Sequence, residues 1–254
     1  MRQLPLNKDF SKTDYLKSIA DDFISDLITD KYKNHQKILE LCHIAKFLSF
    51  FEDSFKIERI NEEPDFIIAS THEKIGLEHQ ILIDNKAKET EGFIENLFKQ
   101  AEQILSNEAE IQNFLANIYI NPFVEIKIND KNQRILEIVD LLKNFLNTGE
   151  LSKNEIIEEI SIMPHSQISL CPNFGGWCQK KITPDLLINA ISKKERLINS
   201  YFQKTNLKQW LLIVIGGVGD SSYEVDTRFD FVIESKFEKI YLLEDFKYRL
   251  YEIK

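Results

Sequence analysis

Residues 209–217, Gln-Trp-Leu-Leu-Ile-Val-Ile-Gly-Gly, contain six consecutive apolar residues. A strand with one face in water alternates apolar and polar side chains, so this unbroken run predicts a strand at the buried centre of a sheet. Segments with helical periodicity and segments with strand periodicity alternate along the rest of the chain. The sequence therefore predicts an α/β fold with a mixed sheet.

Hydrophobic periodicity gives the order of the other elements. Helices are expected over residues 12–30, 34–52, 88–117, 134–146 and 184–203. Strands are expected over residues 55–60, 64–70, 75–84, 159–164, 167–172, 239–246 and 249–254, the last two as edge strands. Residues 117–128 are expected to form a strand pair or one bent strand, and a short segment follows at 229–235. There is no internal repeat and no low-complexity linker. We therefore expect a single domain over residues 1–254, with an N-terminal helical extension over about 1–33.

Composition excludes several classes of protein. Of the 254 residues, 43% are hydrophobic, which is enough to bury a core and excludes intrinsic disorder. No apolar run approaches the ~20 residues of a membrane span, and the first residues lack the apolar segment of a secretory signal. We therefore expect a cytoplasmic protein with no membrane partner. Three cysteines do not make a disulfide framework.

The balance of charges bears on nucleic-acid binding. With 32 Lys and Arg against 41 Asp and Glu, the net charge is −9, which disfavours a protein that binds nucleic acid through a generally basic surface. Residues 180–208 differ from the rest, since they hold seven Lys and Arg side chains and only two acids. An enzyme with a local basic groove is therefore still compatible with the composition.

Two acidic residues, Asp65 and Glu78, fall on consecutive expected strands. If these strands form a hairpin that turns at residues 71–72, the register that pairs Phe66 with Leu77 also pairs Asp65 with Glu78. Directly opposed residues have Cβ atoms ~5 Å apart, so the two carboxylates can share one Mg²⁺. Without a cation they repel each other, and the pair predicts a metal ion, a lysine or a raised pKa.

These residues resemble the motif of the PD-(D/E)XK phosphodiesterase superfamily, to which many restriction enzymes and DNA-repair nucleases belong. Pro64-Asp65 matches the first half of the motif, and Glu78-His79-Gln80 matches the second half with Gln80 in place of the lysine. The order of elements also fits: a helix carrying an acid, an antiparallel strand trio with the motif, a helix, and further strands. The segments around 191–195, 201 and 210–213 look like those of bacterial members.

The resemblance implies a restriction-endonuclease-like core, in which a mixed β-sheet is flanked by helices. It also implies that Asp65 and Glu78 bind Mg²⁺ or Mn²⁺. In this superfamily the motif lysine orients or deprotonates the attacking water and stabilises charge on the phosphorane. The amide of Gln80 can only orient the water, but some members take the lysine from another element.

Lys194 is the candidate for the displaced lysine. The apolar stripe of the expected helix over 184–203 consists of Leu187, Ile191, Ile198 and Tyr201. This stripe skips position 194, so Lys194 points toward the core face. Either its stem packs while the amine reaches water, or the amine reaches the carboxylates of Asp65 and Glu78, where the opposite charge keeps it protonated.

Glu40 lies on the apolar stripe of the helix expected over 34–52. In the resemblance it corresponds to the acid of the first core helix, an additional metal ligand or a residue that positions water. The alternative is that this end of the stripe reaches solvent. His79 alternates with its neighbours in the strand, so we expect it on the opposite face as a structural histidine.

Cys171 and Cys178 are separated by six residues, a gap too long for the usual structural zinc site, which also needs four ligands. The glycines between them favour a flexible loop that places Trp177 at the mouth of the site, where its ring can stack on a base. Packing of Trp177 in the core is the equal alternative.

The resemblance thus implies a divalent-metal-dependent nuclease that hydrolyses phosphodiester bonds of DNA or RNA. Lys194 replaces the motif lysine, and residues 180–208 hold the nucleic-acid backbone. The loss of the motif lysine also fits a catalytically inactive binding or scaffold protein on the same fold, with another protein as its partner. Many relatives of this fold work as dimers, so a homodimer is compatible with the resemblance.

Overall fold

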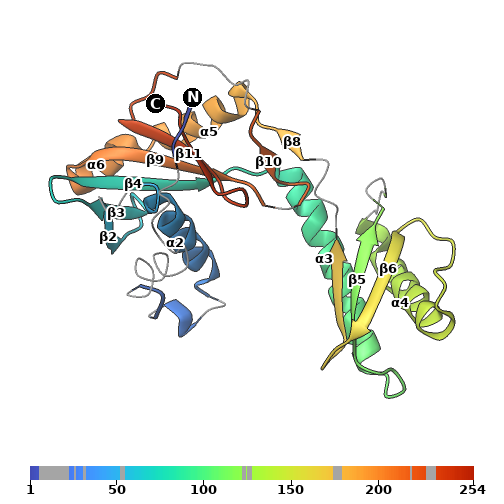
Figure 1. Ribbon diagram of the computed structural model, residues 1–254. Coiled ribbons are helices and arrows are strands. Elements are labelled where there is room, and N and C mark those ends of the chain that lie inside the picture. The colour runs from blue at the N-terminus through green and yellow to red at the C-terminus, as the bar shows by residue number, and fades with distance from the viewer. Residues whose placement is uncertain are drawn as a thin grey trace. The chain divides into compact units, whose positions relative to one another are not determined.

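A computed structural model describes the chain over residues 1–5, 23–25, 27–30, 33–51, 55–121, 124, 128–173, 179–217, 219–226 and 233–254 (Figure 1). The chain is a mixed α/β protein that divides into two compact units. Unit 1 contains residues 1–83, 180–217 and 222–254, and unit 2 contains residues 84–179 and 218–221. Sequence analysis found no boundary within residues 1–254, because the helical periodicity of unit 2 begins directly after a strand of unit 1, without a linker.

Unit 1 is built on a seven-stranded sheet with the order β1-β12-β11-β9-β4-β3-β2. Its strands are β1 (Arg2–Gln3), β2 (Lys56–Ile60), β3 (Phe66–Ala69), β4 (Lys74–Ile81), β9 (Lys208–Ile215), β11 (Lys239–Glu244) and β12 (Arg249–Glu252). Strands β2, β3 and β4 form an antiparallel trio, and β4, β9 and β11 run parallel to one another. The short strands β8 (Lys180–Lys181) and β10 (Tyr223–Glu224) pair separately.

The buried apolar run forms β9, which lies near the middle of the sheet as predicted. The prediction that residues 239–246 and 249–254 form edge strands is wrong, because β12 pairs with both β1 and β11 and β1 is the edge strand on that side. Strand β11 lies between β9 and β12, and five of its six residues are buried. Its continuous run Ile-Tyr-Leu-Leu is the same signal of a strand buried on both faces that identified β9.

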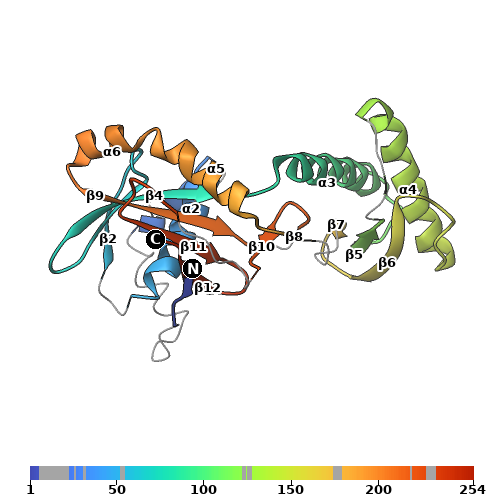
Figure 2. The same ribbon diagram turned by 90° about the horizontal axis from the view of Figure 1, so that it is seen from above.

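Helices cover the two faces of this sheet (Figure 2). Helix α2 (His35–Leu48) packs on one face, on the side of Phe66, Leu77 and Leu212. Helices α5 (Pro184–Glu195) and α6 (Ile198–Thr205) pack on the other face, on the side of Leu211 and Ile213. The alternation of side chains along β9 thus supplies apolar residues to both layers.

The helix expected over residues 184–203 is in fact two helices. Thr183 caps the first by accepting a hydrogen bond from the backbone N–H of Leu186, and Pro184 occupies its first turn. Leu197 donates its N–H to the carbonyl of Lys194, three residues earlier, which forms a tight turn before α6. The turn lies between Lys194 and Tyr201, two residues of the candidate site described below.

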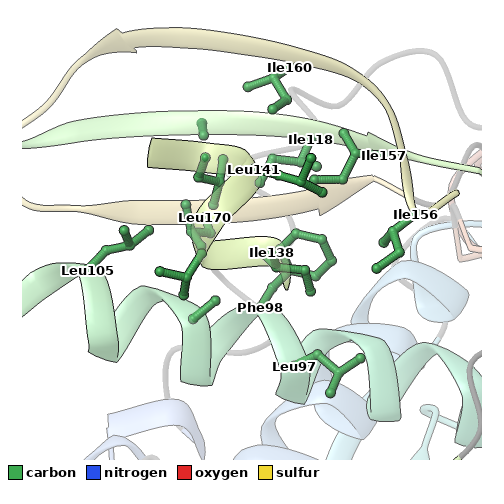
Figure 3. Packing of buried hydrophobic residues seen from close by; sticks show 14 of the residues in the cluster. Leu97, Phe98, Leu105, Ile118, Ile138, Leu141, Ile156, Ile157, Ile160 and Leu170 are labelled. Atoms are coloured by element: carbon green, nitrogen blue, oxygen red, sulfur yellow. The ribbon is translucent and has the colours of Figure 1, made fainter. Parts of the chain in front are cut away.

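Unit 2 has its own core (Figure 3). Its elements are α3 (Asn85–Ser106), β5 (Phe114–Ile120), a 3₁₀ turn (Ile128–Asp130), α4 (Lys131–Thr148), β6 (Ile157–Pro164) and β7 (Ser169–Asn173). The strands form a sheet with the order β6-β5-β7. Leu97 and Phe98 of α3, Ile138 of α4 and Ile118 of β5 are fully buried in this cluster. The helix expected over 88–117 therefore ends earlier, and the β-branched and aromatic residues that follow form β5.

Several sequence predictions lie partly or largely outside the described residues. These are the N-terminal extension over about 1–33 with its helix over 12–30, the strand pair or bent strand over 117–128, and the segment over 229–235, of which residues 233–235 are described and do not form a strand. Within the ranges that the structure describes, none of the helices combines the length and apolarity needed to cross a bilayer.

Candidate functional site

The hairpin of β3 and β4 has the predicted register. Phe66 pairs with Leu77, and Ile68 pairs with Ile75. The strands are joined by a turn over residues 70–73, which the N–H of Ser70 closes by donating to the carbonyl of Glu73 at 2.8 Å. The predicted turn centre at residues 71–72 is confirmed. Continuing this register by one pair brings Asp65 opposite Glu78.

Asp65 and Glu78 are joined by hydrogen bonds between side chain and backbone. The N–H of Asp65 donates to Oε2 of Glu78 at 3.4 Å, and the N–H of His79 donates to Oδ2 of Asp65 at 2.8 Å. The side chain of Glu78 is 4% exposed and that of Asp65 is 18% exposed. The two carboxylates are therefore close and largely removed from water.

Lys194 reaches this pair from α5. Its Nζ lies 2.5 Å from Oε1 of Glu78, and the side chain is 25% exposed. Of the two alternatives for Lys194, the structure therefore shows the one in which the amine contacts a carboxylate of the pair. Tyr201 of α6 is fully buried beside it, close enough for the charge of Glu78 to act on the phenol. Burial, followed by the charge of Glu78, raises the pKa of Tyr201, so this phenol stays protonated.

Helix α2 contributes two residues on the other side of Asp65. Glu40 is buried, and it accepts hydrogen bonds from Gln36 at 3.1 Å and from Lys37 at 2.9 Å. The Nζ of Lys37 is also 3.8 Å from Oδ1 of Asp65. Glu40 thus faces the interior rather than solvent. Lys37 was not identified from the sequence, because only the approach of β3 brings Asp65 beside it.

Within the cluster, the pKa of the Asp65 carboxyl is raised from its ordinary value. Burial, followed by the negative charge of Glu78, raises the pKa of Asp65 to about 6. The N–H of His79 and the ammonium group of Lys37 act in the opposite direction and do not compensate fully. The positive charge near Asp65 therefore offsets only part of the effect of burial and of Glu78.

Gln80 lies two residues after Glu78, on the same face of β4. Its Oε1 is buried and accepts no hydrogen bond from the part of the chain that the structure describes. A buried carbonyl oxygen without a donor is costly. This oxygen is therefore suited to a water molecule or a ligand.

His79 points away from the carboxylates, as expected. Its Nε2 lies 3.0 Å from Nδ1 of His43 on α2, and the two rings stack with their centroids 5.2 Å apart. Both rings are buried, and burial lowers the pKa of each. The pair is therefore neutral at pH 7 and forms part of the packing between α2 and the sheet.

The basic segment 180–208 is less basic than its sequence indicates. Within the described parts of the chain, at least four of its seven cations form ion pairs with carboxylates, namely Lys181 with Glu224, Lys194 with Glu78, Lys204 with Glu63 and Lys208 with Glu238. Lys193 and Arg196 lie outside these pairs, in and directly after the last turn of α5. Trp177 and Cys178 lie outside the described residues.

The side chains that converge here suit a hard divalent cation better than zinc. Over the described parts of the chain, no group of three or more His, Cys, Asp and Glu side chains has the arrangement of a metal site. Mg²⁺, however, commonly uses only one or two carboxylates and keeps several waters. Asp65 and Glu78 could supply oxygen ligands of that kind, and Gln80 carries an oxygen, unpaired within the described residues, on the same face of β4 as Glu78.

Comparisons with protein-family models, with curated proteins and with solved structures found no match to this chain.

Proposed function

We propose that the chain is a divalent-metal-dependent nuclease-like protein that hydrolyses phosphodiester bonds of DNA or RNA. The observation that carries the proposal is the contact of Lys194 with Glu78, beside Asp65. The hairpin of β3 and β4 supplies the two acids, and the distant helix α5 supplies the lysine, that the PD-(D/E)XK motif requires. The order of α2, the antiparallel trio β2 to β4, α3 and further strands also agrees with the order that the resemblance implies.

Each residue has a distinct role in this proposal. Asp65 and Glu78 bind the metal ion, and Glu40 is an additional ligand or positions water. Gln80 orients the attacking water through its amide. The ammonium group of Lys194 stabilises negative charge that develops on the phosphoryl group. Mg²⁺ or Mn²⁺ bound at these carboxylates would lower the pKa of a bound water and neutralise phosphate oxygens.

Substrate binding in this proposal uses the cations that the ion pairs leave available. Lys193 and Arg196 are exposed at the end of α5, close in sequence to Lys194. A phosphate backbone held there would be bound mainly by charge, so binding would weaken as salt is raised. Nothing in this arrangement distinguishes DNA from RNA.

A catalytically inactive binding or scaffold protein on the same fold is the second candidate. It is favoured by the ion pair between Lys194 and Glu78 and by the ammonium group of Lys37 beside Asp65. In that case the acids and lysines stabilise the packing of α2 and α5 on the sheet, and the partner is another protein.

Metal binding and cleavage, measured together, test the proposal. Calorimetry with Mg²⁺ and Mn²⁺ compares the wild type with Asp65→Ala and Glu78→Ala, and single- and double-stranded DNA and RNA are incubated with the same samples. Glu58→Ala is the matched control, because Glu58 is an acid of the adjacent strand β2 whose ion pair with Lys74 lies at the surface. Saturable binding and cleavage that are lost only in the two site variants support the nuclease. A wild type that binds no metal at millimolar concentration and cleaves nothing favours the scaffold.

A further inference from the structure

Two ammonium groups approach the acids from opposite layers of unit 1. Lys194 comes from α5 and bonds Glu78 at 2.5 Å. Lys37 comes from α2, bonds Glu40 at 2.9 Å and lies 3.8 Å from Asp65. Three carboxylates thus share two ammonium groups. A PD-(D/E)XK-type site needs one of these lysines, and the second has no role in the mechanism proposed above.

The two lysines are held differently. Lys194 makes a short contact with Glu78, the most deeply buried acid of the cluster. Lys37 is a hydrogen-bond donor to Glu40 only, because 3.8 Å is too long for a hydrogen bond to Asp65. Its contact with Asp65 is therefore an attraction between charges, which another cation can replace.

The surroundings of Lys37 allow its ammonium group to leave. The side chain is 22% exposed and lies in the first turn of α2, with Nζ 5.3 Å from the centroid of the Phe66 ring. The flexible four-carbon stem of a lysine can move the charge to water while part of the stem stays packed. Glu40 keeps a second donor in Gln36 after Lys37 departs.

We propose that Lys37 is an exchangeable counter-ion, whose ammonium group neutralises Glu40 and Asp65 in the metal-free protein and is displaced when a divalent cation binds there. This inference rests on the proposed function, since it concerns metal binding at the same acids. A cation bound at Asp65 stands close to the ammonium group, and their mutual repulsion drives Lys37 outward. The wild type therefore binds metal more weakly than its carboxylates alone would.

The test compares two substitutions of Lys37 with a control on the same helix. Lys37→Met removes the charge and keeps an apolar stem against Phe66, whereas Lys37→Arg keeps the charge. Lys46→Met is the control, because Lys46 belongs to α2, is exposed to a similar degree and pairs with Asp245. Mg²⁺ binding is measured by calorimetry at low, constant ionic strength, and thermal unfolding is followed with and without Mg²⁺.

We expect Lys37→Met to bind Mg²⁺ about ten-fold more tightly than the wild type, since one neighbouring positive charge is gone. Lys37→Arg and Lys46→Met should not gain affinity. Without metal, Lys37→Met should also unfold at a lower temperature than the wild type, because Glu40 loses its counter-ion. Adding Mg²⁺ should raise the unfolding temperature of Lys37→Met by more than it raises that of the wild type.

Unchanged or weaker Mg²⁺ binding in a folded Lys37→Met protein overturns the inference while leaving the nuclease proposal in place. Tighter binding in Lys37→Arg as well would also overturn it, because the gain would then not come from removing charge. If neither the wild type nor Lys37→Met binds Mg²⁺, the proposed metal site itself fails, and the inference fails with it.

Discussion

The ammonium group of Lys194 lies 2.5 Å from Oε1 of Glu78, although 116 residues separate the two in sequence. The chain between them includes all but four residues of unit 2. Helix α5 therefore contacts Glu78 of β4 although most of unit 2 lies between these two elements in the sequence.

Lys194→Met should destabilise unit 1 and abolish cleavage. Glu78 would remain buried without its ammonium partner, at a cost of about 1–3 kcal/mol, which is below the cost for a fully buried pair because Lys194 is partly exposed. Urea unfolding and nucleic-acid cleavage are the measurements. Lys193→Met, at an exposed position of the same helix, should leave stability nearly unchanged. Equal effects of the two substitutions on the free energy of unfolding would contradict the importance of the Glu78 contact.

Asp65→Asn should stabilise the metal-free protein at pH 7. The pKa of Asp65 is about 6 in the folded protein and about 3.8 when unperturbed, so the folded state prefers the neutral acid. The unfolded state loses this proton first, and stability falls as the pH rises from about 4 to 6. The free energy of unfolding of the wild type should fall by up to about 3 kcal/mol over this range. That of Asp65→Asn should not show this fall. A wild type and a variant with the same pH dependence over this window would contradict the prediction.

The buried pair of His43 and His79 should lower the stability of the protein as the pH falls, whereas Asp65 lowers it as the pH rises. Burial lowers the pKa of both rings below the ordinary value of 6.5, so the unfolded state binds more protons below that pH. Stability contributed by the neutral pair is lost as the pH falls from 6.5 through the lower pKa of the folded protein. His43→Asn should flatten this part of the curve in chemical unfolding experiments, measured in an Asp65→Asn background that removes the opposing effect.

Glu91 should hold the segment around Ser221 in unit 2. The buried carboxylate accepts hydrogen bonds from the N–H of Ser221 at 2.9 Å and from its hydroxyl at 2.8 Å. Glu91→Ala leaves both donors without this acceptor, at a local cost of about 2–3 kcal/mol, whereas Ser221→Ala removes one bond and costs about 1 kcal/mol. Hydrogen exchange at the backbone amide of residue 221 measures the difference in local stability between the two variants. Equal protection in the two variants would show that Glu91 does not anchor the segment.

The part of the site that local periodicity controls could be predicted. Alternation along two short strands fixed the register of Asp65 and Glu78, because shifting the pairing by one residue would expose the apolar face. Helical spacing identified Lys194 in the same way, since an apolar stripe that skips one position marks the side chain there as core-facing.

Features that depend on contacts between distant segments could not be predicted. Lys37 precedes the apolar stripe of α2 and looks like a surface lysine until β3 brings Asp65 beside it. Similarly, the pairing of Lys204 with Glu63 and of Lys208 with Glu238 joins segments that no local pattern relates. The division into two units was missed for a related reason: α3 follows β4 closely, and periodicity does not reveal which core a helix joins.

The parallel pairing of β4 with β9 has a consequence for how this chain can change in evolution. Parallel neighbours always need a crossover connection, and here that connection contains most of unit 2 along with α5 and α6. The entropic cost of closing a connection grows only with the logarithm of its length. Residues 84–179 can therefore be lengthened, shortened or replaced at little cost to the strand register that holds Glu78, so the inserted unit can diversify while the acid cluster stays the same.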